Sequence, residues 1–137
     1  MKINEIKQIP DSKIGKLNKN KVVPKPNEEF TLNYLLLFGF NIELIRPTST
    51  QKVKNPDVLI MGTIWEIKTP TSSSKNTIKN RFREASNQAA KVIFDLRKVK
   101  KDADKVEKQL LELFRGNGTV RRMMIIQKSG TLLDFIK

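Results

Sequence analysis

The sequence predicts an α/β (α+β) domain in which helices flank a mixed central sheet. Three segments of residues 27–137 place apolar residues at helical spacing, and short apolar, β-prone runs separate them. The predicted order is α-β-β-β-α-β-α-β-β, in which single and consecutive strands both occur, as is typical of a mixed sheet with helices packed on it. A chain of 137 residues is long enough for one domain with its own core.

The first 26 residues differ in composition from the rest of the chain. They are rich in lysine, contain Pro10, Pro24 and Pro26, and show little sustained periodicity. This composition predicts that residues 1–26 form a basic, flexible N-terminal arm before a folded domain at 27–137. The arm is either a nucleic-acid-binding extension or a linker without contacts.

Caps and apolar spacing predict three helices. The first has Asn27 as its N-cap and two acids in its first turn, and it ends close to Gly39. The second covers residues 75–90, with an apolar stripe spaced four, three and four residues apart. The third covers residues 101–114 and ends before a Gly-Asn-Gly sequence.

Short apolar runs predict six strands. Residues 91–96 are nearly all apolar, which indicates a strand at the centre of the sheet. The predicted strands are 40–45, 58–61, 64–67, 91–96, 122–127 and 131–136.

The second and third strands are predicted to form a hairpin around Gly62-Thr63, a sequence that suits a type II′ turn. The opposed pairs would be Met61 with Ile64, Leu59 with Glu66, and Asp57 with Lys68. Because side chains alternate along a strand, Asp57, Glu66 and Lys68 would project from one face. Trp65 would point to the other face, into the core.

The charge balance favours a polyanionic partner. Lysine and arginine number 27 against 14 acidic residues, a net charge of +13 and more than solubility needs. The chain contains no cysteine and no histidine, which excludes disulfides, thiolate nucleophiles, histidine general bases and HExxH zinc sites. No apolar run approaches the length of a membrane span, so no membrane anchoring is expected.

Two carboxylates and one ammonium group on one strand face suggest phosphodiester hydrolysis with a divalent metal ion. Asp57 and Glu66 would be metal ligands together with the backbone carbonyl of Ile67, and Lys68 would position water or neutralise charge. Oxygen ligands favour Mg²⁺ or Mn²⁺ over Zn²⁺. Glu28, in the first turn of the first helix, would add a carboxylate, or else only complement the helix dipole. A Glu-x-Lys pair alone is common on solvated strands.

The loop after Lys68 leads into a helix and would suit a phosphate group. Its hydroxyls, its backbone amides and Lys75 could bind phosphate beside the metal, although a flexible loop with a serine cap is the alternative. The residues expected to bind nucleic acid are Ser74, Lys75, Asn76, Thr77, Lys79 and Arg83.

Two motifs resemble the PD-(D/E)xK nuclease superfamily. They are Pro56-Asp57 and Glu66-x-Lys68, preceded by Glu28 on the first helix with Gly39 eleven residues later. The predicted element order also resembles the restriction-endonuclease-like core of that superfamily. The resemblance implies that Glu28, Asp57 and Glu66 bind metal and that Lys68 assists the attacking water.

A longer stretch resembles the C-terminal toxin domains of CdiA-type contact-dependent growth inhibition proteins. It comprises Pro-Asp-x-Leu-Ile-x-Gly-x-x-Trp-Glu-Ile-Lys-x-Pro from residue 56, Ser-Lys-Asn-Thr-Ile-Lys from residue 74, and Asp95-Leu96-Arg97. This resemblance implies a monomeric nuclease toxin that is secreted or delivered into the cytoplasm of a target bacterium. It also implies tRNA as the favoured substrate, RNA contacts from Asn76, Thr77 and Lys79, and a cognate immunity protein.

Three functions are consistent with the sequence. The first is a metal-dependent RNA nuclease toxin. The second is a DNA endonuclease of the same fold, of the restriction or junction-resolving type. The third is a basic nucleic-acid-binding module without catalysis, against which the acidic residues argue, because carboxylates repel phosphates.

Overall fold

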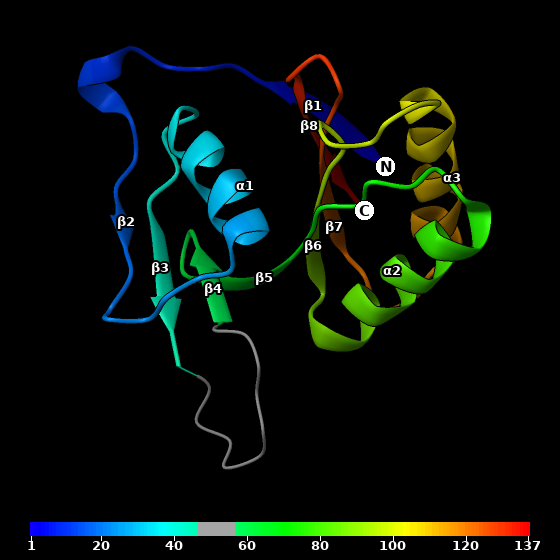
Figure 1. Cartoon of the computed structure of the whole chain (residues 1–137), viewed down its shortest axis with the longest axis horizontal. Helices are drawn as coiled ribbons and strands as arrows, with labels where there is room; N and C mark the ends of the chain where they lie inside the picture. Colours follow the sequence, from blue (N-terminus) through cyan, green and yellow to red (C-terminus); the bar gives the residue numbers. More distant parts are fainter. Residues whose placement is uncertain (47–56) are drawn as a thin grey trace. The chain divides into compact units, whose positions relative to one another are not determined.

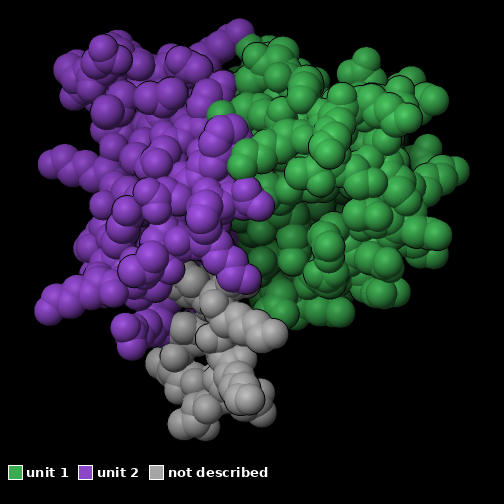
Figure 2. Space-filling model, in the orientation of Figure 1, with its two compact units in different colours: residues 1–6, 66–137 green, residues 7–65 purple. Residues whose placement is uncertain are grey.

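The computed structural model describes residues 1–46 and 57–137. The chain divides into two compact units (Figure 2): residues 7–65, and residues 66–137 together with residues 1–6. Asn55 and Pro56 of the predicted motif lie outside the described residues, whereas Asp57 lies within them.

The unit of residues 1–6 and 66–137 contains a mixed sheet. Its strands are β1 (Lys2–Ile6), β8 (Leu132–Ile136), β7 (Arg122–Ile126), β6 (Lys91–Asp95) and the last three residues of β5 (Thr63–Lys68). The pairs β5–β6 and β6–β7 are parallel, while β7–β8 and β8–β1 are antiparallel. β6 therefore lies inside the sheet, as its nearly continuous apolar sequence predicted, and both of its neighbours are parallel to it.

Two helices of this unit, α2 (Lys75–Gln88) and α3 (Ala103–Gly116), lie side by side in Figure 1. Their apolar stripes share one buried cluster with Val92 and Phe94 of β6 and with residues of β7 and β8. The rings of Phe82 and Phe94 stack with their centroids 6.1 Å apart. Burial of these stripes is the main force that fixes α2 and α3 on the sheet.

Two buried carboxylates in this unit have arginine partners. Arg97 donates from Nε and Nη2 to Asp95 at 3.0 and 2.7 Å, and Arg122 donates to Asp134 in the same two-pronged way at 3.0 and 2.7 Å. Both carboxylates are almost fully buried, so each needs the paired charge and the two hydrogen bonds to offset its desolvation.

The unit of residues 7–65 is built on the helix α1 (Pro26–Leu36) and short strands. The strands are β2 (Leu17–Asn18), β3 (Ile42–Ile45), β4 (Asp57–Ile60) and the first three residues of β5. β2 is parallel to β3, and the β3–β4 and β4–β5 pairs are antiparallel. Trp65 is 1% exposed, which confirms its predicted place in the core.

The predicted order of elements is confirmed from residue 26 onward, as α1-β3-β4-β5-α2-β6-α3-β7-β8. The N-cap of α1 is Lys25 rather than Asn27, because Pro26 occupies the first helical position, where its fixed φ angle and missing N–H are favourable. Gly39 has a φ of 89°, as its predicted place after the helix requires.

The N-terminal segment differs from the predicted flexible arm. Residues 1–26 contain β1, the 3₁₀ turn η1 (Asp11–Lys13) and β2, and the two units divide after residue 6 rather than after residue 26. β1 is joined to β8 through its backbone, and Ile3, one of its two apolar residues, is 54% exposed. A strand that is held mainly by backbone hydrogen bonds does not need alternating apolar side chains, so its sequence has little pattern that predicts a strand.

The predicted hairpin register is wrong by two residues. Leu59 lies opposite Ile64 rather than Glu66, and the turn residues are Met61 and Gly62, with φ values of 54° and 75°. Two positive φ angles define a type I′ turn, whose twist matches that of the flanking strands better than the twist of a type I or II turn does. With Val58 opposite Trp65, the register that would set Asp57 opposite Lys68 is not formed.

Gly15 provides a test of how the N-terminal segment packs within the unit of residues 7–65. A Cβ atom at Gly15 would lie 1.6 Å from the carbonyl oxygen of Phe40, and backbone atoms cannot relieve such a contact by changing rotamer. Gly15→Ala should therefore lower the free energy of unfolding by roughly 3 kcal/mol or more, measured by urea denaturation.

Gly118→Ala is the matched control, because a Cβ atom there meets nothing within 4 Å. Equal stability of the two variants would show that residue 15 does not pack against Phe40.

Candidate functional site

Strand β5 places Glu66 and Lys68 on one face of its sheet. Glu66 pairs with Val92 and Lys68 pairs with Phe94, and both of these β6 residues belong to the core beneath α2 and α3. The two charged side chains therefore emerge on the face that the helices cover, and both are half-buried. Partial burial strengthens electrostatic interactions by lowering the local dielectric constant.

Lys68 contacts an acidic residue that sequence analysis did not select. Its Nζ donates to Oε2 of Glu84 on α2 at 3.4 Å, and the Lys68 side chain is 20% exposed. Arg81 donates to the same carboxylate, at 2.7 Å to Oε1 and 3.2 Å to Oε2. Glu84 thus joins the end of β5 to the middle of α2 and holds the ammonium group of Lys68 at the edge of the core.

Opposing effects act on the pKa of Glu84. Desolvation raises the pKa, but the positive charges of Lys68 and Arg81 and their hydrogen bonds lower it by more in total, so it lies below the ordinary value. Glu84 is consequently ionised at neutral pH. The stabilising contact with Lys68 is present above the pKa of the unfolded state and is lost as the pH falls through the lower pKa of the folded state.

Glu84 had a signal in the sequence, although a weak one. It is the only acidic residue in α2, a helix that also carries four basic residues. An isolated acid among basic residues indicates a local partner, but nothing in the sequence pairs Glu84 with Lys68, sixteen residues earlier on a strand.

The other two predicted catalytic residues belong to the unit of residues 7–65. Asp57 opens β4, lies opposite Ile45 on β3 and is half-buried. Glu28 lies in the first turn of α1 and is also half-buried. Ile67, whose carbonyl was predicted to bind metal, lies on β5 opposite Ile93. The four predicted catalytic residues are therefore divided two and two between the units.

The donor chemistry of these residues suits a hard divalent cation. Within residues 1–46 and 57–137 no group of three or more acidic side chains is close enough together to hold a metal ion. Mg²⁺ does not require such a group, because in many nucleotide enzymes it is bound through one or two carboxylates, several waters and the phosphates of the substrate. By its donor chemistry the half-buried carboxylate of Glu66 fits a site of that kind.

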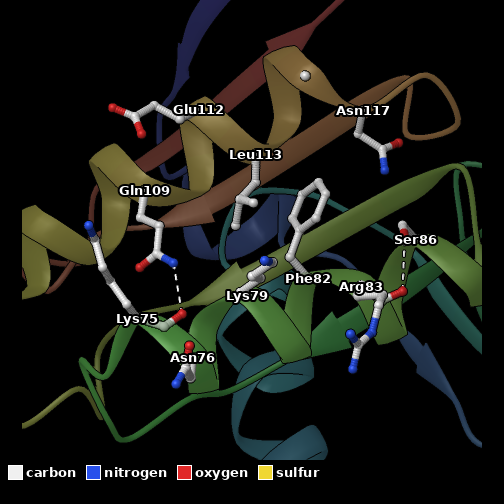
Figure 3. A pocket seen from close by; sticks show the side chains of 11 residues that line it. Lys75, Asn76, Lys79, Phe82, Arg83, Ser86, Gln109, Glu112, Leu113 and Asn117 are labelled. Atoms are coloured by element: carbon white, nitrogen blue, oxygen red, sulfur yellow. Dashed lines mark hydrogen bonds between the residues drawn. The ribbon is translucent and has the colours of Figure 1, made fainter.

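Four of the six predicted nucleic-acid contacts line one cavity between α2 and α3 (Figure 3). They are Lys75, Asn76, Lys79 and Arg83, all on α2. Ser74 is the N-cap of α2 and lies outside the lining. Thr77 also lies outside it, on the side of α2 that carries Arg81 four residues later and Glu84 seven residues later.

The cavity has a volume of about 670 Å³. Its α3 wall is formed by Gln109, Glu112, Leu113, Gly116 and Asn117, while Phe82 and Ser86 complete the α2 wall. Gln109 Nε2 donates to the carbonyl oxygen of Lys75 at 2.9 Å, which ties the two walls together at one end (Figure 3). Sequence analysis predicted the basic residues, but it did not predict the α3 wall that turns them into a cavity.

Comparison with known proteins gives the family. A family model of the contact-dependent growth inhibition CdiA C-terminal domain matches residues 54–132, more than half of the chain. The chain therefore belongs to this family, and it is a contact-dependent growth inhibition toxin domain of the CdiA type. No curated protein matches the sequence.

One solved structure is similar in fold. It is the CdiA-CT/CdiI toxin and immunity complex from Burkholderia pseudomallei, one chain of which has a TM-score of 0.57 and 19% identity. The similarity covers 90% of this chain and 100% of that chain. At this identity the comparison supports the mixed α+β fold. No helix in the described part of the chain is long and apolar enough to cross a membrane.

The contact between Lys68 and Glu84 can be tested by NMR titration of the Glu84 carboxyl group. Lys68→Gln removes one of the charges that lower the pKa of Glu84 and leaves desolvation in place, so the pKa should rise. Lys108→Gln, on the exposed face of α3, is the control and should leave the pKa unchanged. An unchanged pKa in Lys68→Gln would show that the two side chains do not interact in solution.

Proposed function

We propose that this toxin domain is a divalent-metal-dependent nuclease of the PD-(D/E)xK type that cleaves RNA, with tRNA as its favoured substrate. The observation that carries the proposal is the placement of Glu66 and Lys68 on one face of β5, half-buried, with Lys68 held by Glu84. A carboxylate and a cation side by side at the edge of a core serve phosphodiester chemistry, which needs a metal ligand and a positive charge close to the scissile phosphate.

Each residue has a distinct role in this proposal. Glu66 and the carbonyl of Ile67 would hold Mg²⁺ or Mn²⁺, and Asp57 and Glu28, from the unit of residues 7–65, are the further ligands that the sequence predicts. When bound, the ion polarises the phosphate and acidifies a coordinated water. Lys68 neutralises charge that develops on the phosphate, and Glu84 orients it, because an ammonium group that donates to a fixed carboxylate samples fewer positions.

The composition of the chain supports a metal-based mechanism. The sequence contains no histidine, so an imidazole general base is not available. Its net charge of +13 attracts nucleic acid and predicts a strong dependence of affinity on salt.

Partner and location follow from the same proposal. The solved structure with a similar fold is a complex of a toxin with its immunity protein. We propose that this chain likewise has a cognate immunity protein, and that it is delivered as a monomer into the cytoplasm of a target bacterium. An immunity protein would protect the producing cell if it blocked access of RNA to Glu66 and Lys68.

Cleavage of total bacterial RNA and of plasmid DNA, each with Mg²⁺, Mn²⁺ or EDTA, tests the proposal. Glu66→Gln and Asp57→Asn should each lower the rate of RNA cleavage on the order of a thousandfold, because loss of a metal ligand removes several kcal/mol of transition-state stabilisation. Asp104→Asn, which changes an acid in the first turn of α3, is the matched control and should cleave like the wild-type chain.

The outcomes separate the candidate functions. Loss of tRNA that EDTA prevents supports the proposal, whereas nicking of plasmid DNA alone would identify a DNA endonuclease. Full activity of Glu66→Gln would overturn the assignment of the site. RNA binding without cleavage under any of these metals would favour a binding module.

A further inference from the structure

Helix α2 carries charge on two separate faces. Arg81 and Glu84 lie on the face that contacts Lys68. Lys79 and Arg83 lie on the face that lines the cavity with α3. Five residues along an α-helix correspond to a rotation of roughly 140°, so Lys79 and Glu84 point in widely different directions. The cavity is therefore separate from the Lys68–Glu84 contact, although one helix supplies both.

The basic residues of the cavity differ from Arg81 in their partners. Arg81 is neutralised by Glu84 at 2.7 Å, whereas Lys75, Lys79 and Arg83 form no ion pair with any described residue. All three are exposed, and they lie along a little over two turns on one wall of a concave surface. The lining holds these three cations against one carboxylate, so its net charge is positive, and it attracts anions because the low-dielectric walls focus the field.

The two walls of the cavity differ in chemistry. The α2 wall supplies all three cations, while the α3 wall supplies the one carboxylate of the lining, Glu112, together with the amide of Gln109 and the apolar side chain of Leu113. Glu112 would repel a phosphate, but it can accept a hydrogen bond from the amino group of a nucleobase. An occupant with an anionic side and a flat, partly apolar, hydrogen-bonding side matches this arrangement.

We propose that the cleft between α2 and α3 binds a nucleotide segment of single-stranded RNA, with its phosphates on Lys75, Lys79 and Arg83 and a base toward α3. The volume of about 670 Å³ lies in the range of small-molecule sites and accommodates a base with its sugar. Unpaired RNA fits better than a duplex, because only an unpaired base can enter a cleft.

This proposal rests on the proposed function, because that function supplies RNA as the substrate. The cleft adds a second place where the protein contacts the RNA. RNA bound in the cleft would run along α2, whose opposite side contacts Lys68 at the end of β5. The cleft would contribute to affinity and to the choice of substrate, whereas the carboxylates and Lys68 would carry out the chemistry. The two contributions can be removed independently.

The test measures binding rather than cleavage. A fluorescein-labelled single-stranded RNA 12-mer is titrated by fluorescence anisotropy in EDTA, at several salt concentrations. Lys79→Gln combined with Arg83→Gln should weaken binding at least tenfold and reduce the slope of log affinity against log salt by about 1.4, or about 0.7 for each lost phosphate contact. Lys108→Gln with Arg115→Gln, two exposed α3 residues outside the cavity lining, removes the same charge and should weaken binding less than threefold.

A second variant guards against loss of folding. Asn76→Glu places an acid in the cleft, but also in the first turn of α2, where the helix dipole stabilises an acid. This variant should keep the wild-type circular dichroism spectrum and melting temperature, and it should bind the 12-mer at least fivefold more weakly. Asn76→Gln is its neutral control and should bind like the wild-type chain.

The outcomes separate this proposal from the proposed function. Wild-type RNA affinity in both cleft variants would overturn the cleft proposal and would favour an acidic protein as the ligand of the cavity. Metal-dependent cleavage of RNA is measured separately and would not be affected by that result. RNA binding that requires the cleft, without cleavage under any metal, would support the cleft and reject the nuclease.

Discussion

Strand β5 is the constraint on which the rest of the structure depends. Its first three residues pair with β4, and its last three pair with β6. Alternation along this strand buries Trp65 on one face and turns Glu66 and Lys68 to the other. A shift of one residue in the pairing with β6 would exchange the two faces and place the charges where an apolar residue belongs.

The second constraint is the orientation of α2, whose surface has three sides of different chemistry. One side is apolar and fixes the helix in the core through Ile78, Phe82 and Ala85. A second side carries Glu84 toward Lys68, and a third carries the basic residues of the cleft. Because rigid elements hold side chains more precisely than loops do, the core stripe sets the direction of both charged sides.

Elements with a periodic apolar pattern are the ones that the sequence predicts well. The stripe of α2 and the nearly continuous apolar run of β6 have lengths and spacings that allow few alternatives, and both elements were predicted close to their observed bounds. Strand β1 was not predicted, because a strand joined mainly through backbone hydrogen bonds has little side-chain pattern. The hairpin register was missed because Met61 adopts a positive φ, which turn preferences assign to glycine or asparagine.

The candidate site was predictable in part for the same reason. The Glu66-x-Lys68 pair is local, so its shared face follows from alternation alone. Glu84 and the α3 wall come from elements far away in the sequence, and only tertiary packing brings them to Lys68 and to the basic side of α2. When residues come into contact only through tertiary packing, the spacing between them in the sequence gives no sign of the contact.

The cleft is built from lysine and arginine in a chain that lacks histidine and cysteine, the side chains that ordinarily change charge closest to neutral pH. Its electrostatic character is therefore nearly constant across the range of pH that separates a cell exterior from a cytoplasm. What varies across such a boundary is the ionic composition and the supply of polyanions. The attraction of the cleft for anions would therefore change with the salt concentration and the polyanions around it, and hardly at all with acidity.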